Sequence, residues 1–549
     1  MLIAKNNGFF GRAAKVSSFD KRAIHPEQVP QRPRKKMTNQ AVRSSRGRIV
    51  FVLLAFVLVW MGSLALVAPA QAQVTIIRIS LDKFTNTDSV HKTEVEPFTF
   101  SWGSTIVSAY HVGRRPGSIG WGSADIGYST SINGGKTWTY GYLPGLTVNY
   151  QGGTYGAESD PGVAYDAKHG QWLISSLPLV GLNPFSGSIG NVGVSRSTDG
   201  LHWGNLILID STALDDKDWI VCDNTTTSKY YGNCYKEWDQ AYGSGDILMS
   251  VSSDGGLTWG PGKASADQAG GLGGEPLVQP NGTVIVPFQG GGIDAFVSTN
   301  GGSTWGTSVV VADINSHFEG NGFRNPDLPS AAIDGAGKVF VAWSDCRFRT
   351  GCAENDIVFS TTTNGTTWTA PVRIPIDATT STVDHFLPGI GIDPATSGAT
   401  AHLTVVYYYY PVSNCTFTTC NLEVGFTTST DGGTTWTAGK HIAGPMKLAW
   451  LPNSDNGYMV ADYIGVTYNA GNPFGVFAVA KTPSGKILQE SMFTTTKPLI
   501  VSDDEPRYSS ANDQPVPGAK SDHEMIFYYD DGGHRRIPQW RLTKHPNAQ

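Results

Sequence analysis

One eight-residue phrase recurs along the chain and constrains its fold more than any other feature of the sequence. Two of its copies are one residue shorter than the others. The copies are Ser131–Trp138 (SINGGKTW), Ser197–Trp203 (STDGLHW), Ser252–Trp259 (SSDGGLTW), Ser298–Trp305 (STNGGSTW), Thr362–Trp368 (TTNGTTW) and Ser429–Trp436 (STDGGTTW). Their tryptophans follow one another at an average interval of about 60 residues. A period of this size predicts a repeat architecture with one copy in each structural unit.

The residue types of the phrase predict a β-hairpin turn. An Asp or Asn side chain accepts hydrogen bonds from backbone N–H groups two residues further on, and Gly supplies the positive φ of a tight turn. Strand-like segments flank the copies, for example Asp356–Ser360 (DIVFS). The Trp can pack under the turn while its indole N–H finds a nearby acceptor.

These six copies resemble the Asp-box (BNR repeat) of β-propellers in the sialidase-like superfamily, over roughly residues 90–500. The resemblance implies an all-β fold of four-stranded antiparallel blades. It also implies that the boxes lie at the blade periphery, away from the central channel, and are structural. Asp-boxes occur in sialidases, in xyloglucanases and in non-enzymatic receptors, so the box itself does not specify an activity.

A second repeat precedes the boxes and predicts the innermost strand of each blade. Its copies are short apolar segments opened by an acid or Pro: 96–100 (EPFTF), 160–166 (DPGVAYD), 218–223 (DWIVCD), 275–279 (EPLVQ), 328–334 (LPSAAID), 387–393 (LPGIGID) and 462–467 (DYIGVT). A middle strand follows several of them, as at 105–110, 339–343 and 403–408. Seven inner strands favour a seven-bladed propeller, with six blades as the alternative.

The two ends of the propeller region raise the question of ring closure. Residues 74–80 (VTIIRIS) can add a closing strand to the last blade, which would pair an otherwise exposed edge. Residues 73–549 are expected to form one domain with its core at about 90–500, and 500–549 closing the ring or flanking it.

The N-terminal region 1–72 has a different composition. It carries 12 Lys and Arg against 2 Asp and Glu, and its apolar run at 49–68 is followed by an A-x-A site at 68–72. This order is typical of a secretory signal peptide, with Met37 as a plausible start. The run of about 20 residues is also long enough to anchor the chain in a membrane. We therefore expect a secreted or extracytoplasmic protein, with an anchor at residues 49–68 as the alternative to a cleaved signal peptide.

The charge of the chain limits its binding partners, and the spacing of its cysteines predicts its disulfides. The remaining 28 Lys and Arg face 44 Asp and Glu, which disfavours nucleic acid and anionic lipid surfaces as partners. All cysteines occur in close pairs, which predicts the local disulfides Cys222–Cys234, Cys346–Cys352 and Cys415–Cys420. A metal site is the rival interpretation, but there is no C-x-x-C and no His at ligand spacing, so no metal or other cofactor is expected.

Chemistry in a propeller is expected where the inner strands open onto the central funnel. Acids, Arg, His and Tyr that converge there can provide the proton donor and the opposing nucleophile of glycoside hydrolysis. We predict Asp160 as acid/base, Tyr463 as nucleophile and Glu275 as its helper. The predicted substrate-binding residues are Arg324, Arg347, Asp218 and His385. Each of these side chains could instead cap a turn or fill a core.

The sialidase family makes a further demand, three Arg that clamp the sialate carboxylate, the first of them in an R-I-P motif ahead of the first box. At the comparable early position this chain has Glu96, with no Arg nearby. Its R-I-P strings stand elsewhere, at 373–375 and 536–538. The family's first catalytic Arg is therefore not transferable to this sequence.

The sequence as a whole leads to two functional hypotheses. One is a secreted sialidase-like glycoside hydrolase that acts on terminal sialic acid or a related exposed sugar of a glycoconjugate. The other is a non-catalytic propeller that binds a glycan or protein partner at the cell surface. The missing early Arg favours the second, and the acid-rich funnel favours the first. Serine-hydrolase, nucleotide-binding and zinc-protease motifs are absent.

Overall fold

The computed structural model describes residues 74–180, 189–211, 215–240, 245–454, 456–500, 504–521, 523–526 and 539–542. All of them belong to one compact unit, Ala72–Gln549. The predicted signal peptide or anchor at 49–68 lies outside the described residues, as does the rest of the N-terminal region 1–72 with Met37. Over the ranges that are described, no helix is long and apolar enough to cross a bilayer.

The described chain is all-β, with only single turns of 3-10 helix such as Thr350–Cys352. Four sheets share one antiparallel plan of four strands: β14 (Leu277–Val278), β15 (Val284–Gln289), β16 (Ile293–Ser298) and β17 (Val309–Ala312); β18 (Ser330–Ile333), β19 (Val339–Asp345), β20 (Asp356–Thr362) and β21 (Val372–Arg373); β22 (Asp384–Ile392), β23 (Leu403–Tyr410), β24 (Leu422–Ser429) and β26 (Lys440–Met446); and β29 (Gly465–Asn469), β30 (Asn472–Ser484), β31 (Ile487–Thr495) and β1 (Ile76–Arg78).

Two further sheets depart from this plan. A nine-stranded sheet contains β2 (Glu94–Trp102), β3 (Thr105–Arg114), β4 (Ser123–Ser131), β5 (Thr139–Tyr142), β6 (Ala157–Asp166), β7 (Gln171–Val180), β8 (Ile189–Gly190), β9 (Val192–Ser197) and β10 (Ile207–Asp210). A three-stranded sheet contains β11 (Asp216–Cys222), β12 (Cys234–Asp239) and β13 (Ile247–Ser252).

The predicted blade count is wrong. Counted as separate hydrogen-bonded sheets of at least four strands, the described residues form five blades, neither seven nor six. The first reason is the pairing of Ser123 with Glu158, which joins two repeat units into the nine-stranded sheet. The second is that the β11–β13 sheet has no fourth strand, since its next segment contributes only isolated bridges, Met249 with Lys263 and Asp246 with Gly270.

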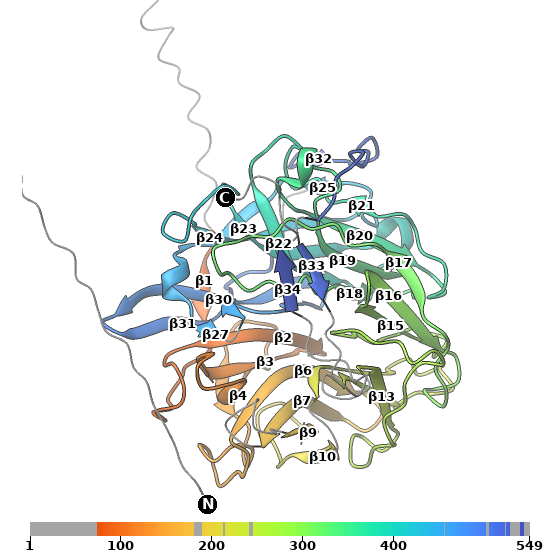
Figure 1. Ribbon diagram of the computed structural model, residues 1–549. Helices are drawn as coiled ribbons and strands as arrows, with labels where there is room; N and C mark the ends of the chain where they lie inside the picture. The colour runs from red at the N-terminus through yellow and green to blue at the C-terminus, as the bar shows by residue number, and fades with distance from the viewer. Residues whose placement is uncertain are drawn as a thin grey trace, which may run out of the picture. The chain divides into compact units, whose positions relative to one another are not determined.

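The predicted innermost strands are nevertheless present. Each of the seven apolar segments contains or overlaps one, in the order β2, β6, β11, β14, β18, β22 and β29. Each contacts the next, and β29 contacts β2, so that the inner strands form a closed ring around a common axis. Figure 1 shows the sheets following one another around this centre, with the last strands, β30 and β31, beside the first.

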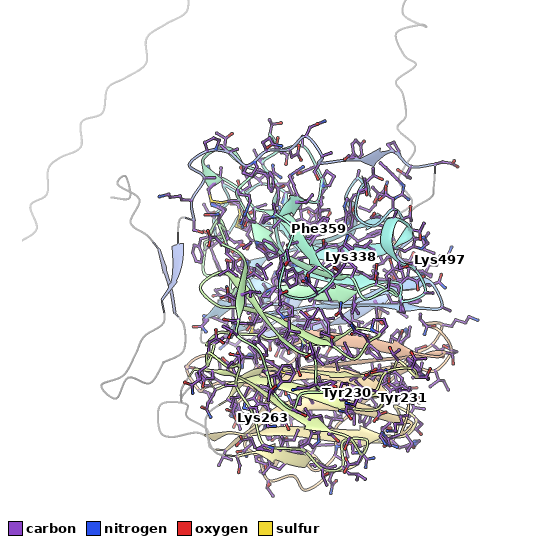
Figure 2. All side chains as sticks on the ribbon, turned by 90° about the vertical axis from the view of Figure 1, so that its right-hand side faces the viewer. Tyr230, Tyr231, Lys263, Lys338, Phe359 and Lys497 are labelled. Carbon is purple, nitrogen blue, oxygen red and sulfur yellow. A yellow bond between two sulfur atoms is a disulfide. The ribbon has the colours of Figure 1, made fainter. Side chains whose placement is uncertain are left out.

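The recurrent phrase forms the same turn in every copy, between the third strand of a unit and the segment that follows it. At Ser429–Trp436, Gly433 N donates to Ser429 Oγ (3.0 Å), Thr435 N to Asp431 Oδ1 (2.9 Å), and Trp436 Nε1 to Gly433 O (3.0 Å). Trp436 also packs against Phe359 of the neighbouring sheet, with ring centroids 6.1 Å apart (Phe359 is labelled in Figure 2). The phrase therefore anchors each turn to the core between adjacent sheets.

The two ends of the described chain flank the ring at different places. Strand β1 pairs with β31, as predicted for residues 74–80, and so covers the outer edge of the last sheet. In the C-terminal segment, β32 (Arg507–Tyr508) pairs with β25 (Trp436–Thr437), and Val516 N donates to Arg347 O (2.7 Å). The described part of 504–521 thus runs along the sheets and adds no inner strand.

The three predicted disulfides are confirmed, and they leave no free cysteine. Cys222–Cys234 joins directly paired residues of β11 and β12. Cys346–Cys352 and Cys415–Cys420 close short loops between strands. With every Cys in a disulfide, the rival prediction of a cysteine metal site is excluded.

The tryptophan of the last turn offers a test of this packing. Trp436 is only 1% exposed, so Trp436→Ala should lower the free energy of unfolding by about 3–5 kcal/mol, because it removes a large side chain from a packed core. Urea denaturation of the full chain measures this. Trp138→Ala is the matched control, since Trp138 makes the same indole hydrogen bond but is only partly buried. Equal losses in the two variants would contradict the anchoring role.

Candidate functional site

The openings of four inner strands share an unusual backbone. Glu96 (φ 55°), Asp160 (φ 44°), Lys217 (φ 39°) and Leu387 (φ 50°) have positive φ, and the pairing register of β2, β6, β11 and β22 shifts at or beside these residues. Positive φ is uncommon for residues other than Gly, and a bulge redirects a side chain out of the ordinary pleat. The bulges explain how side chains from separate strands come together on the axis.

Three of these residues, Glu96, Asp160 and Lys217, form one largely buried cluster with Arg324 and Asp462, which we call the axial ion network. Lys217 Nζ lies 2.7 Å from Asp160 Oδ1, 2.7 Å from Asp462 Oδ2 and 3.7 Å from Glu96 Oε1. Arg324 Nε donates to Asp462 Oδ1 (2.7 Å) and Arg324 Nη2 to Asp462 Oδ2. One ammonium and one guanidinium therefore hold carboxylates contributed by three different inner-strand openings.

This pairing sets the protonation states. Burial alone would raise the pKa of Asp160, but the charge of Lys217 outweighs it and keeps that pKa below its usual value. Asp462 behaves in the same way: burial opposes ionisation, yet Arg324 and Lys217 hold its pKa far below the usual range. For Lys217, burial would lower the pKa, but the surrounding carboxylates raise it well above normal. Asp160, Asp462 and Lys217 are thus charged throughout the physiological pH range.

A small cavity of about 40 Å³ adjoins the network, and its walls include Glu96, Asp160, Lys217 and Arg324. Two further acids line it, and burial shifts both in the opposite direction to Asp160. It raises the pKa of Asp215 to about 8 and the pKa of Asp216 to about 6. Asp215 is 2% exposed, and neither of its carboxylate oxygens has a hydrogen-bond partner among the described residues, whereas Asp216 is partly exposed.

Beneath the network lies a plug of apolar side chains, which we call the axial plug: Phe98, Trp219, Leu272, Leu328 and Tyr463. The Tyr463 ring packs on Trp219 with centroids 4.7 Å apart, and its hydroxyl donates to Pro161 O (3.5 Å). Burial raises the pKa of Tyr463 well above normal. Tyr463, the predicted nucleophile, is therefore near the predicted acid/base Asp160 but is buried as a phenol.

Glu275, the predicted helper of Tyr463, lies below the plug. It lines a second cavity of about 300 Å³ along the axis, and its Oε2 accepts the backbone N–H of Ala331 (2.8 Å). No hydrogen bond joins it to Tyr463. Asp218 lies near the network but is engaged by Lys236, while Ser175 Oγ donates to it at 3.2 Å. Burial raises the pKa of Asp218 to about 7.

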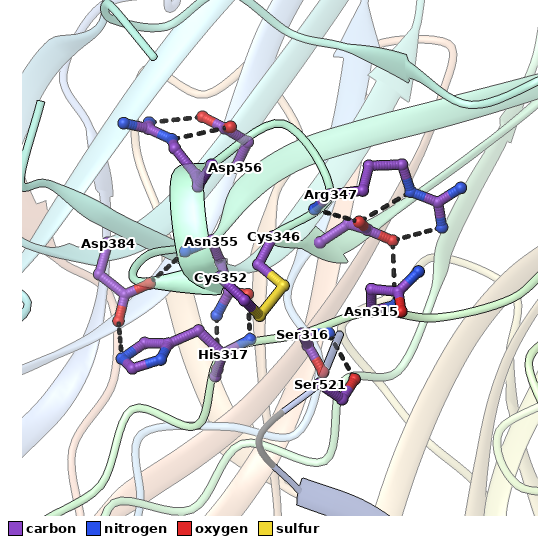
Figure 3. Close-up of a disulfide and its surroundings, with 12 residues drawn as sticks. Asn315, Ser316, His317, Cys346, Arg347, Cys352, Asn355, Asp356, Asp384 and Ser521 are labelled. Atoms are coloured by element: carbon purple, nitrogen blue, oxygen red, sulfur yellow. Dashed lines mark hydrogen bonds and ion pairs between the residues drawn. A yellow bond between two sulfur atoms is a disulfide. The ribbon is translucent and has the colours of Figure 1, made fainter. Parts of the chain in front are cut away.

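The other two predicted substrate-binding residues lie elsewhere: Arg347 is in the β19–β20 connection, beside the Cys346–Cys352 disulfide (Figure 3), and His385 is on β22. Arg347 donates to Asp345, with Nε at 2.8 Å and Nη2 at 2.6 Å, and is 15% exposed. His385 Nε2 lies 3.8 Å from Asp377, which also accepts from Arg349 and Arg373. Burial lowers the pKa of His385. The structure thus brings Asp160 and Arg324 into one network, and places Arg347 beside Asp345 and His385 beside Asp377.

Two groups of described residues have metal-like donor sets, Glu96–His111–Asp160 and Asp356–Asp377–His385, each with its ligand atoms within 4.8 Å of one another. The carboxylates of both groups are already paired with cationic side chains. Lys217 occupies the carboxylates of the first group, and Arg349 and Arg373 those of the second. A metal ion would have to displace these groups, so neither set fits a metal.

The sequence interpretation missed Lys217, His111 and the acids Asp215 and Asp216. His111 Nε2 lies 2.8 Å from Glu96 Oε2 and also accepts the backbone N–H of Asp160 (2.8 Å). The available signal was the run 215–219 (DDKDW), in which a Lys precedes a predicted inner strand at the place where Glu96 and Asp160 precede theirs.

Comparison with known proteins gives structural similarities only. No protein-family model matches the chain, and no curated protein shows significant similarity. Among solved structures, a protein of unknown function from Dyadobacter fermentans is similar with 16% identity and a TM-score of 0.41, covering 66% of this chain and 100% of that one. The Hadza microbial sialidase Hz136 is similar with 14% identity and a TM-score of 0.37, covering 74% of this chain and 66% of that one. A PL25 ulvan lyase is similar with 10% identity and a TM-score of 0.44, covering 76% of this chain and 95% of that one. Similarities of this size do not assign an activity.

The network predicts a specific dependence of stability on Lys217. Lys217→Met leaves buried carboxylates unpaired and should lower the free energy of unfolding by about 3–5 kcal/mol at pH 7. Asp160 and Asp462 have lowered pKa values, so their contribution is present above the unfolded-state value of about 4 and is lost as the pH falls through the folded values. In the variant these acids can take up protons, so the deficit should shrink toward pH 4.

Thermal unfolding of the full chain between pH 4 and 8 measures this, and Lys236→Met is the matched control. Lys236 is equally buried, but its partner Asp218 has a pKa of about 7 and can be neutral at pH 6. The control should therefore lose less stability than Lys217→Met at pH 6. A deficit that does not change with pH would refute the ionised network.

Proposed function

We propose that the protein is an extracytoplasmic glycoside hydrolase whose site is the cavity beside the axial ion network. One observation carries the proposal: carboxyls tuned in opposite directions line the same cavity. Burial raises the pKa of Asp216 to about 6, while Lys217 keeps Asp160 ionised beside it. Glycoside hydrolysis requires such a pair, a proton donor for the leaving oxygen and a carboxylate that stabilises positive charge on the sugar or activates water.

The roles follow from these states. Asp216 is partly exposed and can hold a proton below about pH 6, so it is the general acid of the proposal. Asp160, which the sequence suggested as acid/base, is held ionised and serves as the carboxylate. Tyr463 supports the network from below as part of the axial plug. Because the enclosed volume of about 40 Å³ accepts water rather than a sugar ring, the sugar would rest at its mouth.

The cations of the cavity bear on the substrate. Arg114, Lys217 and Arg324 line it, which suits a sugar that carries a carboxylate, with terminal sialic acid as the first candidate. Arg324 already forms two hydrogen bonds to Asp462, and Arg347 lies in another ion pair. Recognition of a sialate would therefore use a different set of groups from three converging Arg.

A second candidate function is a non-catalytic propeller that binds a glycan or protein partner at the cell surface. Its support is that the network satisfies its own charges: Lys217 and Arg324 both contact Asp462 at hydrogen-bonding distance. Such pairing is also what a purely structural lock between inner strands would show. The hydrolase proposal also includes export of the protein through a signal peptide.

The test is hydrolysis of fluorogenic glycosides by the full chain, starting with a sialoside, from pH 4 to 8. We expect kcat/KM to fall as the pH rises above about 6, because Asp216 must be protonated. Asp216→Asn should reduce kcat by roughly 10²–10⁴-fold. Asp254→Asn, in a turn of the recurrent phrase and outside the cavity, should leave turnover unchanged.

The outcomes separate the two functions. Turnover that survives Asp216→Asn would remove Asp216 as the acid. Absence of turnover on every glycoside, with a glycan-array signal for the same sample, would establish the binding function instead. A sialoside-specific loss in Arg324→Ala, with neutral glycosides unaffected, would assign Arg324 to the substrate carboxylate.

A further inference from the structure

The axial cavity of about 300 Å³ is separate from the proposed catalytic site. All seven inner strands contribute to its wall, and none of its lining residues lines the small cavity above. The axial plug divides the two: Lys217 Nζ lies 5.9 Å from the centre of the Tyr463 ring, and Trp219, on which that ring packs, lines the axial cavity. Its volume is at the lower end of the range of small-molecule sites.

The wall of this cavity is largely apolar and carries a single acid, although Thr, Ser and Asn residues also line it. The described lining residues include Leu277, Ile333, Ile390 and Val466, and they include no Lys, Arg, His or Asp. Glu275 is the only carboxylic acid among them. The apolar part of this wall suits the hydrocarbon part of a ligand.

Glu275 departs from the rule that a buried acid is paired with a cationic group. Glu275 is 8% exposed, and its side chain accepts the backbone N–H of Ala331. Burial raises its pKa to about 8, and no cationic side chain contributes to the shift. Every carboxylate of the axial ion network has a cationic partner, whereas Glu275 has none among the described lining residues. A buried carboxyl without such a partner is expensive to ionise unless a ligand supplies the positive charge.

Aromatic side chains also line the axial cavity. Phe98 and Trp219 close the inner end of the cavity, with ring centroids 6.5 Å apart, and Phe100 lines its wall. At the rim, Trp102 is 41% exposed and stacks on Tyr165 at 5.4 Å. Aromatic rings combined with a carboxylate attract ammonium groups through the ring quadrupole and the opposite charge.

We propose that the axial cavity binds a small apolar amine, with its ammonium paired to Glu275 and its hydrocarbon part against the inner strands. Apolar contact provides the affinity, and the single carboxyl selects the cation over a neutral molecule of the same shape. This site is independent of the proposed hydrolase activity and requires no change in the axial ion network.

Benzylamine and its neutral isostere benzyl alcohol are suitable probes. Their binding to the full chain is measured by calorimetry at pH 8 in phosphate buffer, which contains no competing amine. We expect saturable binding of one benzylamine per chain and at least tenfold weaker binding of benzyl alcohol. Glu275→Gln should remove this preference, because the amide retains the shape of the acid but not its charge.

Two controls keep the result interpretable. Glu158→Gln replaces another fully buried acid that does not line this cavity, so it should keep the preference. Glu275→Leu should lose benzylamine binding while benzyl alcohol binds at least as well as to the unaltered chain, which serves if the Gln variant does not fold. Absence of benzylamine binding, or equal binding of both probes to the unaltered chain, would overturn the proposal.

Discussion

The pairing of the Lys217 ammonium with carboxylates from neighbouring strands is the interaction on which the centre of this structure depends. Asp160 and Asp462 each lie 2.7 Å from it, and they come from segments far apart in the sequence. Without a cation between them, acids at the inner ends of adjacent strands would repel one another in a region with little water. The bulges at Glu96, Asp160 and Lys217 make this meeting possible, because a regular strand would direct the side chains between the sheets.

Much of the fold follows from local sequence, and its sheet count does not. The turn at Ser429–Trp436 is specified within eight residues, since its acceptor, its glycines and its Trp are all present in the phrase. The seven inner strands were also recognisable from short apolar segments. The number of separate sheets depends instead on single long-range pairings, such as Ser123 with Glu158, and on a missing strand after β13. Neither has a local signature.

The candidate site was predictable where strand position alone decided the outcome. Asp160 and Arg324 were expected at the funnel because of their place at strand openings, and both belong to the network. Tyr463 and Glu275 are predicted to form a pair, yet Tyr463 lies within the axial plug and Glu275 lies in the cavity below it, and this depends on packing that a sequence pattern does not contain. Arg347 pairs with Asp345, and His385 lies 3.8 Å from Asp377, so neighbouring acids already engage both side chains. Lys217 is not predicted by the repeat pattern, because that pattern places an acid or Pro at the opening of each inner strand.

Ionisable groups are therefore buried in two different ways along the axis of the ring. In the axial ion network, acids and bases are matched, and the matching moves the pKa values of Asp160 and Lys217 apart, so that both remain charged. Below it, Glu275 is unmatched, and burial favours its neutral form. A matched network stabilises the ring and resists change, since removing one member leaves the others uncompensated. An unmatched acid in an apolar cavity gains most from a partner that comes from outside. The separation of the two by Tyr463 and Trp219 keeps the network's cations from satisfying Glu275.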